Sequence, residues 1–324
     1  MATISIIVPV KLGGYVAAFD SIRQSGFDKD RYEVLLAEGS APSRQRNQAA
    51  NAATGDVLYF IDDDSRLNKD NLSICSSAMS DDEIAVVGGP SITPATDSIL
   101  QQLFGFALSS ALGSGAVRNR YRAFGSPRET SDKELILCNL AIRRTVFTAL
   151  GGFDERLYPN EENELLDRVR MAGFRLMHIP DMSVFRSQRT SLKAFVRQMF
   201  AYGRGRAQQS LISRSFSIVS FIPLFFTLYL ILSVFFFSHT LFLVPLLVYA
   251  ALVALFTLIG ISKSGRISAI MLMLLYPLMH CCNGAGLMYG LIGGKPDPVH
   301  DDGIVVTRIK EFGQDFPESK CPDY

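Results

Sequence analysis

The chain has 324 residues, of which 48% are hydrophobic and 19% are charged, and its mean hydropathy is +0.20. These values exclude an intrinsically disordered chain and are unusual for a single soluble domain. The net charge of +1 arises from 32 basic and 31 acidic residues, and this balance argues against a nucleic-acid-binding protein. We therefore expect no nucleic acid among its partners.

Charged residues are distributed unevenly along the chain. Residues 1–215 hold 26 basic and 24 acidic side chains, whereas residues 216–262 and 267–294 hold none. The first region has the balance of a soluble domain, and the second has the composition of membrane-spanning segments. The sequence thus predicts a soluble domain at 1–215, transmembrane helices within 216–294 and an acidic polar tail at 295–324. No secretory signal precedes the first strand-like run, so we expect the soluble domain in the cytoplasm.

The first third of the chain alternates strand-like and helix-like segments. Short β-branched runs predict four buried strands, and one intervening segment predicts a helix: strands at 4–10, 34–37, 57–61 and 84–87, and a helix at 43–53. Strands that alternate with helices imply an α/β fold with a mostly parallel, Rossmann-like sheet. Ligands of such sheets bind at the carboxyl ends of the strands, and Glu38 and residues 62–64 are expected there.

Residues 97–133 are rich in Ser, Gly and Arg and only weakly periodic, which predicts an irregular excursion that faces the substrate. Arg118, Arg120 and Arg122 alternate, so an extended segment would place all three on one face. That face is either a solvated edge or a patch that binds phosphate. Later runs predict a strand at 135–142 and helices at 145–150 and 161–171.

Seven basic residues and no acidic residue occur between Arg186 and Arg214. Large apolar side chains are interleaved at helical spacing, which predicts a basic amphipathic helix at about 188–214. Such a helix, placed directly before an apolar span, is attracted to an anionic membrane surface by roughly 1 kcal/mol per basic residue. We expect it to dock on membrane lipids at the interface.

Three apolar stretches follow, at about 216–237, 241–261 and 267–291. The first two have the length needed to cross roughly 30 Å of hydrocarbon, and three residues join them as a hairpin. The third is interrupted by Pro277, Asn283 and glycines, so it either spans with a kink or re-enters. The basic flanks place both ends of the hairpin in the cytoplasm, and a third crossing would put the tail outside. We expect a multi-pass protein of the cell inner membrane.

The triplet Asp62-Asp63-Asp64 follows the predicted strand 57–61. Adjacent carboxylates repel one another, and oxygen ligands suit Mg²⁺ or Mn²⁺, which can neutralise a bound diphosphate. A bare acidic triplet is usually a solvated turn. Its position at a strand end favours a metal site.

A second acidic cluster, Glu161-Glu162-Asn163-Glu164, begins a predicted helix. One interpretation is a helix amino terminus enriched in acids because they suit the helix dipole. The other is a general base that takes the proton from an acceptor hydroxyl. The spacing alone leaves both interpretations open.

Taken together, these segments resemble the family 2 glycosyltransferases. The nucleotide-sugar half is carried by Ile6-Ile-Val-Pro-Val, Arg46-Asn47, Thr54-Gly55-Asp56 and Phe60-Ile-Asp-Asp-Asp, and the acceptor half by Gly151-Gly-Phe-Asp-Glu155, Asn160-Glu-Glu162, Arg168 and Gly173. The resemblance covers residues 4–215 and implies a GT-A catalytic domain. The run Tyr202-Gly-Arg-Gly-Arg206 and the apolar helices after it are similar to the membrane-anchored succinoglycan-type branch, which takes part in exopolysaccharide assembly.

The resemblance implies roles for individual residues. Asp62 and Asp64 match an Asp-x-Asp metal motif, and Asp63 between them is a filler or an auxiliary ligand in the nucleotide-sugar site. Glu162 occupies the place of the family's catalytic aspartate and Glu161 that of the preceding glutamate. The nucleotide cleft would also be lined by Pro9, Glu38 and Arg46. Candidates for binding the acceptor or its phosphates are Arg118, Arg120, Arg122, Asn139, Arg197, Gln198, Arg204 and Arg206.

Two departures from the family pattern bear on function. Glutamate instead of aspartate at 162 moves the carboxylate by about one methylene, so either the acceptor sits differently or Glu161 acts as the base. Processive members carry Gln-x-x-Arg-Trp before the membrane, whereas here Gln198 is followed by Ala201-Tyr202. The second departure favours addition of a single sugar.

We therefore expect an inverting enzyme, dependent on Mn²⁺ or Mg²⁺, at the cytoplasmic membrane face. It would move one sugar from a nucleoside-diphosphate sugar, a UDP-sugar in our expectation, to a lipid-linked polyprenyl acceptor in cell-surface glycan synthesis. One alternative is a polyprenyl-phosphate sugar synthase, whose acceptor is the phosphate itself. An alternative from another class is a catalytically inactive membrane scaffold with the same fold.

Overall fold

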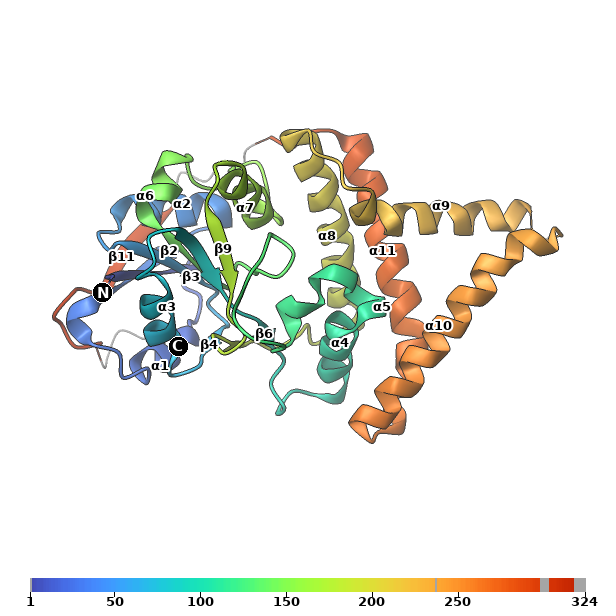
Figure 1. Cartoon of the computed structure of the whole chain (residues 1–324), viewed down its shortest axis with the longest axis horizontal. Helices are drawn as coiled ribbons and strands as arrows, with labels where there is room; N and C mark the ends of the chain where they lie inside the picture. Colours follow the sequence, from blue (N-terminus) through green and yellow to red (C-terminus); the bar gives the residue numbers. More distant parts are fainter. Residues whose placement is uncertain (1, 237, 298–302, 318–324) are drawn as a thin grey trace. The chain divides into compact units, whose positions relative to one another are not determined.

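The computed structural model describes residues 2–236, 238–297 and 303–317. They form two compact units, each assembled from segments distant in the sequence (Figure 1). The first unit takes its residues from Met1–Pro94, Asn119–Ser187 and Asp297–Tyr324, and the second from Ala95–Arg118 and Gln188–Pro296. These units do not coincide with the predicted division at 215 and 295, because the basic helix belongs with the apolar helices and the described tail residues at 303–317 belong with the sheet.

An eight-stranded sheet forms the core of the first unit, in the order β11-β2-β1-β3-β8-β5-β9-β7. Its strands are β1 (Ile4–Val10), β2 (Tyr32–Glu38), β3 (Val57–Ile61), β5 (Ile84–Gly88), β7 (Arg128–Glu129), β8 (Asn139–Arg143), β9 (Arg175–His178) and β11 (Val305–Lys310). β1 pairs in parallel with β2 and β3, whereas β8 runs antiparallel to β3 and β5. The α/β fold class is therefore confirmed, but the sheet is mixed rather than mostly parallel. A long excursion, not one crossover helix, precedes β8, so parallel pairing is not imposed there.

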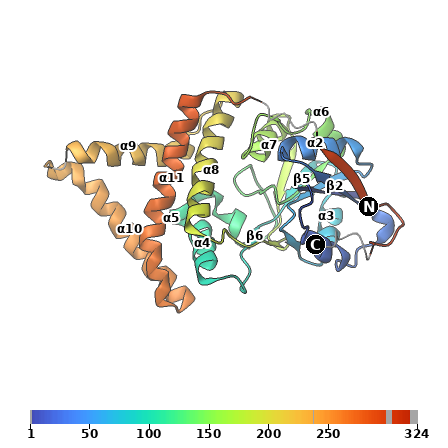
Figure 2. The ribbon, with the colours of Figure 1, turned by 180° about the vertical axis from the view of Figure 1, so that it is seen from behind.

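Helices cover both faces of this sheet. Every residue of β1 and β3 is buried, as expected of β-branched strands covered on both sides. One face packs against α1 (Ala18–Arg23) and α3 (Asn71–Ala78), and the other against α2 (Pro42–Ala52), α6 (Arg144–Ala149) and α7 (Glu161–Met171). Figure 2 shows the same layers from behind. The helices predicted at 43–53, 145–150 and 161–171 are confirmed to within two residues at each end.

The excursion after β5 is more regular than predicted. It contains α4 (Ile99–Ser109), α5 (Ala111–Ser114) and a 3₁₀ helix at Gly115–Tyr121. α4 begins with a capping box, in which Ser98 and Gln101 satisfy each other's backbone amides. The prediction of an irregular loop was wrong over α4 because this local cap outweighs weak periodicity. A small sheet of β4 (Arg66–Leu67), β10 (Val184–Phe185) and β6 (Ser91–Ile92) lies beside the main one.

The predicted polar tail contributes a strand to the main sheet. β11 pairs antiparallel with β2, and Arg308 Nε lies 3.2 Å from Oε2 of the fully buried Glu33. Lys310 is also buried, and its ammonium donates to the carbonyl oxygens of Lys29 and Tyr32. Within the described residues the tail thus contains an edge strand, which the sequence did not predict. Its parts at 298–302 and 318–324, like residue 237 at the end of the first predicted span, lie outside them.

The second unit is helical. Its long helices are α8 (Leu192–Ser213), α9 (Ile222–Phe235), α10 (Thr240–Ser264) and α11 (Leu272–Gly293), and short 3₁₀ turns at Ile218–Phe221 and Ile267–Met271 precede α9 and α11. Within the described residues, three helical stretches are long and apolar enough to cross a membrane: Ile218–Phe235, Thr240–Ser264 and Ile267–Gly293. The helix predicted at about 188–214 is α8.

Candidate active site

The carboxyl ends of β1, β2 and β3 meet at one edge of the sheet because these strands are parallel neighbours. Asp62, Asp63 and Asp64 follow β3 there, and Glu38 ends β2. The Glu38 carboxylate accepts a hydrogen bond from Gly13 N at 3.1 Å, and Asp63 O accepts one from Ala18 N. The structure thus places Glu38 and the three aspartates at one edge, as the strand pattern predicts.

The second acidic cluster forms the first turn of α7. All four of its residues are buried: Glu161, Glu162, Asn163 and Glu164. Burying three carboxylates in one helical turn is costly unless nearby positive groups or hydrogen bonds stabilise their charges. The positive end of the helix dipole supplies part of this stabilisation. Asn160, in the left-handed conformation with φ 89°, turns the chain into the helix.

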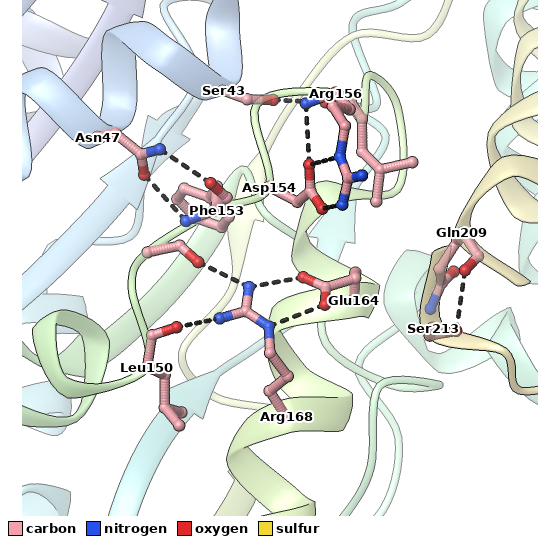
Figure 3. A network of polar contacts seen from close by, with 12 residues as sticks. Ser43, Asn47, Leu150, Phe153, Asp154, Arg156, Glu164, Arg168, Gln209 and Ser213 are labelled. Atoms are coloured by element: carbon pink, nitrogen blue, oxygen red, sulfur yellow. Dashed lines mark hydrogen bonds and ion pairs between the residues drawn. The ribbon is translucent and has the colours of Figure 1, made fainter. Parts of the chain in front are cut away.

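Glu164 has a structural role that separates it from the other two glutamates. Both of its oxygens accept from Arg168, which also donates to the carbonyl oxygens of Leu150 and Gly152 (Figure 3). The Asn47 side chain holds the same loop through the backbone N and O of Phe153, at 2.9 Å each. This network fixes α7 relative to α2, leaving Glu161 and Glu162 as the candidates for chemistry.

Arg46, from α2, connects the two acidic clusters. Its Nη1 lies 3.0 Å from Glu161 Oε1 and its Nη2 lies 2.8 Å from Asp62 Oδ1. The Arg46 and Glu161 side chains are almost completely buried. α2 is set at the strand ends by Gln45, whose side-chain amide donates to Val10 O and Ala37 O. One guanidinium therefore brings residues 99 positions apart, Asp62 and Glu161, into a single site.

Arg186, directly after β10, connects the carboxylates at the ends of the Asp triplet. Its Nη1 lies 3.2 Å from Asp62 Oδ2 and its Nε lies 2.7 Å from Asp64 Oδ1. The strand β10 pairs with β4, which follows the triplet, and this pairing sets Arg186 opposite the acids. The sequence placed Arg186 in the basic run next to the membrane, so its role at this site was missed. The signal that could have found it is its position directly after a short apolar run, Val184-Phe185.

Arg120 pairs with the second cluster. Its Nη1 lies 3.5 Å from Glu162 Oε1, and Nη2 donates to Asn163 Oδ1 and to the carbonyl oxygen of Asp132. Arg118, Arg120 and Arg122 do not share one extended face, because Gly115–Tyr121 is a 3₁₀ helix with three residues per turn. Arg122 instead donates to Asn119 Oδ1 and stacks on Phe124. The predicted three-arginine patch is therefore corrected to one buried arginine at the site.

The remaining predicted residues fall into two groups. Pro9 lies within β1, and Asn139 is fully buried in β8, where it accepts from Tyr59 Oη and donates to Met182 O. Asn139 is thus a core residue rather than an acceptor-binding one, because both ends of its amide are occupied by the protein. The candidates on α8 belong to the second unit: Arg197, Gln198, Arg204 and Arg206. The Gln198 side chain donates a hydrogen bond to Tyr202 Oη and accepts one from Arg189. Arg206 donates a hydrogen bond to Gln209 Oε1.

Burial and mutual repulsion shift the acids of the site. Burial raises the pKa of Glu161, and although Arg46 opposes this, the charges of Glu162 and Asp62 raise it further. Burial and the charges of Asp64 and Asp62 raise the pKa of Asp63 to about 6. Both shifts are those expected of crowded carboxylates that lack enough positive charge.

The Asp triplet fits a divalent cation by its donor chemistry. Within the described residues, no group of three or more His, Cys, Asp or Glu side chains is arranged to hold a metal ion. Asp62 and Asp64 nevertheless converge on one positive group, the Arg186 guanidinium. Magnesium commonly binds through one or two carboxylates plus substrate phosphates and waters. The residues present therefore fit a cation whose other ligands come from a bound diphosphate.

The model of the family described as glycosyl transferase family group 2 matches residues 57–279, which are well over half of the chain. The chain belongs to this family. It is therefore an enzyme of the glycosyltransferase class, as the sequence motifs predicted. The family match includes β3, the Asp triplet, α7, the helices α8 to α10 and the first part of α11.

Two individual proteins are similar to this glycosyltransferase. The succinoglycan biosynthesis protein ExoA of Rhizobium meliloti (strain 1021) is 35% identical over 118 residues, which are 36% of this chain and 34% of ExoA. The match thus spans about a third of the length of that relative. The solved structure of the mannosyltransferase PcManGT from Pyrobaculum calidifontis, in complex with GDP-Man and Mn²⁺, has a TM-score of 0.52 and 17% identity. The aligned region covers 90% of this chain and 87% of the PcManGT chain, and this likeness confirms the GT-A fold.

Proposed function

We propose that this glycosyltransferase inverts the anomeric centre of a nucleoside-diphosphate sugar, a UDP-sugar in the first instance, and transfers one sugar to a lipid-linked acceptor. The single observation that carries the proposal is the contact of Arg46 with both Asp62 and Glu161. A carboxylate cluster for the diphosphate and a carboxylate cluster for the acceptor are what a single displacement requires, provided that they face one site.

Glu162 is the proposed general base. Its carboxylate has one weak ion pair, with Arg120 at 3.5 Å, and retains some exposure. Glu161 is held by Arg46 at 3.0 Å and is the more deeply buried of the two. A base must reach the acceptor hydroxyl, and Glu162 is the less buried and less tightly held of the two carboxylates. Arg120 acts as a positioning residue, because it also binds Asn163 and the backbone at Asp132.

The donor diphosphate would bind at Asp62, Asp64 and their arginines. A Mn²⁺ or Mg²⁺ ion held by Asp62 and Asp64 supplies charge neutralisation of the leaving diphosphate. Arg186, which bridges these two carboxylates, is then available to donate to phosphate oxygens. Arg46 keeps Asp62 and Glu161 in place while the donor is bound. Pro9 and Glu38, on the same strand ends, line the nucleotide side of the site.

The acceptor and cellular setting are proposed from the helices and from the relative. In the part of the chain that the structure describes, three helical stretches are long and apolar enough to cross a membrane, and α8 before them carries basic residues. The printed name of ExoA places that protein in succinoglycan biosynthesis. We extend this to exopolysaccharide assembly on a polyprenyl-linked acceptor, at the cytoplasmic face of the inner membrane. We also propose the catalytic unit and the helical unit as the functional domains.

The test is release of nucleoside diphosphate by detergent-purified full-length protein, with a panel of UDP- and GDP-sugars, Mn²⁺ and a membrane lipid extract. We expect turnover that needs a divalent cation and is lost in Asp64→Ala. Activity of Asp64→Ala equal to wild type would overturn the metal assignment. An acid-labile product would identify the sugar as phosphate-linked, and donor binding without turnover over the whole panel would indicate an inactive scaffold.

A further inference from the structure

The strand β11 limits how many times the chain can cross a membrane. It follows the apolar helices in the sequence and pairs with β2 from Val305, opposite Glu38, to Lys310, opposite Val34. The pairing is supported by the Arg308–Glu33 ion pair at 3.2 Å. Segments before and after the apolar helices therefore belong to one sheet and lie on one side of any membrane. The number of complete crossings between them must be even, so the three candidate spans cannot all cross.

The three candidate spans differ in burial and hydropathy. Over a window of 18 residues, Ile218–Phe235 and Thr240–Ser264 have mean hydropathies of 2.4 and 2.6, and 11% of each window is buried within the protein. The corresponding window of Ile267–Gly293 has a mean hydropathy of 1.4, and 33% of it is buried. The third span is therefore the least apolar of the three and gives the largest share of its surface to protein contacts. It is the span least suited to cross.

The carboxyl-terminal half of α11 packs tightly along α8, and the two helices lie side by side in both views (Figures 1 and 2). A Cβ at Gly286 would lie 2.0 Å from Phe200 O, and one at Gly203 would lie 2.0 Å from Asn283 O. The Phe200 and Tyr289 rings are 5.6 Å apart. The backbones are thus in contact, and α11 must lie at the same depth as α8.

α8 cannot lie in hydrocarbon. Four basic residues occur along it, at Lys193, Arg197, Arg204 and Arg206. Each charge at the centre of a bilayer costs roughly 2.5–3.5 kcal/mol on insertion scales, whereas the same charges are favourable beside anionic headgroups. α8 therefore lies at the lipid–water interface, and the close contact holds α11 there with it.

The first half of α11 rests partly on short segments that are unable to span. His280 Nε2 lies 2.9 Å from Leu112 O in α5. Leu272 packs against Gly260, near the carboxyl end of the crossing helix α10. Arg266, just before this helix, donates to Gln102 of α4 at 2.9 Å. α4 has 11 residues, about half of what a membrane span requires. α11 thus contacts elements of the interface along both halves, and its first half also contacts α10.

α9 and α10 have the properties of a crossing pair. Their exposed side chains are almost all apolar, including Phe225, Leu232, Leu247 and Leu258. Tyr229 Oη donates to Phe242 O and accepts from Leu246 N, which joins the two helices near their connection. In both views α9 leaves α11 and α10 returns to it (Figures 1 and 2). Two crossings by this hairpin return the chain to the side of the sheet.

We propose that the chain enters the membrane only as the α9–α10 hairpin, while α8 and α11 lie together in the interface and contact lipid headgroups. β11 then joins the sheet on the side where the chain began. The side chains of α11 that we propose to contact lipid are exposed and apolar: Met273, Leu274, Tyr289 and Ile292. The proposal does not depend on the proposed enzymatic function, because it follows from strand pairing and helix packing.

The test is labelling of full-length protein in sealed membrane vesicles of known orientation with a membrane-impermeant maleimide. Single cysteines are introduced by Lys69→Cys in the catalytic unit, Ser238→Cys at the hairpin connection and Glu311→Cys after β11, in a background with Cys281, Cys282 and Cys321 changed to alanine. Cys75 and Cys138 stay, because both are buried. We expect 69 and 311 to be labelled from the same side and 238 from the opposite side. Labelling of 311 and 69 from opposite sides would overturn the proposal.

A depth measurement tests α11 separately. Spin labels at Leu274→Cys and Ile292→Cys on α11 are compared with one at Leu247→Cys on α10, through collision with oxygen and with a polar nickel complex. We expect both α11 labels to report headgroup depth and the α10 label to report the hydrocarbon centre. A central depth at either α11 position would overturn the interfacial placement. Variants whose size-exclusion profiles match that of wild type are taken as folded. Reporter fusions to the carboxyl terminus of the unmodified chain independently show on which side of the membrane the tail lies.

Discussion

Nη1 of Arg46 lies 3.0 Å from Glu161 Oε1, and both side chains are almost completely buried. The same guanidinium reaches Asp62 at 2.8 Å, so one cation links the aspartates after β3 to the glutamates of α7. Arg186 and Arg120 complete the arrangement by pairing with Asp64 and Glu162. In this structure arginines hold the acids together at the place where we propose that the donor binds.

Arg46→Gln should strongly destabilise the catalytic unit. Removing one partner of a buried ion pair leaves uncompensated carboxylates, at a cost of about 3–5 kcal/mol in the free energy of unfolding. Arg44→Gln is the matched control, because Arg44 lies on the same helix at 4.0 Å from a partly exposed Glu155 and should cost about 0–1 kcal/mol. Denaturant unfolding in detergent measures both. Equal midpoints for the two variants would contradict the bridging role of Arg46.

Glu162→Gln and Glu161→Gln should differ in their effect on turnover. A general base contributes about 10²–10⁴-fold, so Glu162→Gln should lower kcat by at least about 10²-fold and leave donor affinity nearly unchanged. Glu161 is held by Arg46 at 3.0 Å and is almost completely buried, so Glu161→Gln should lower kcat less than Glu162→Gln does. Single-turnover kinetics with donor titration separate the two. The reverse order of effects would assign the base to Glu161.

Arg186→Ala should increase the affinity for Mn²⁺ in the absence of donor. Arg186 bridges Asp62 and Asp64 at 3.2 and 2.7 Å and therefore competes with a cation for the same carboxylates. Electron paramagnetic resonance of free Mn²⁺ measures binding without any turnover. Arg189→Ala, whose side chain bonds Gln198, is the control and should bind Mn²⁺ as wild type does. Weaker binding by Arg186→Ala would contradict the competition.

Glu134 should make part of the stability dependent on pH. Burial alone would raise the pKa of Glu134, but hydrogen bonds from Arg128, Asn119 and Thr130 outweigh it and lower the pKa to about 2. The folded state therefore favours the ionised form, and this stabilisation is present above the ordinary pKa of 4.5 and is lost as pH falls toward 2.

Thermal unfolding between pH 7 and pH 3 measures this contribution. Glu134→Gln should unfold at a lower temperature than wild type at pH 7, and the difference should narrow as pH falls below 4.5. Glu129→Gln, an exposed neighbour paired with Arg175, is the control. A constant difference across the whole pH range would show that ionisation of Glu134 does not stabilise the fold.

The sequence predicted the parts of the fold that local pattern determines. β1 and β3 have the predicted bounds because a β-branched run between turn residues has few alternatives. α7 begins at Glu161 as predicted, since acids favour a helix amino terminus. β11 was missed because its strand character depends on the exposed edge of β2, which no local pattern records.

The candidate site could also be predicted only where local sequence patterns record it. The two acidic clusters are visible in the sequence as runs, and the family motifs name their members. The arginines that neutralise them come from α2, the 3₁₀ helix before β7 and the segment after β10, and only the sheet topology brings these together. Arg186 was grouped with the membrane-facing bases because charge runs carry no information about which sheet edge a residue meets.

The central claim is that both acidic clusters face one bound donor. Its most direct test is a structure of the full-length protein with a UDP-sugar and Mn²⁺. We predict Mn²⁺ density beside Asp62 and Asp64, the Arg186 guanidinium displaced from these carboxylates toward the diphosphate, and the sugar on the side of Glu162. Donor density away from Asp62 and Asp64, or a sugar that does not approach Glu162, would contradict the account.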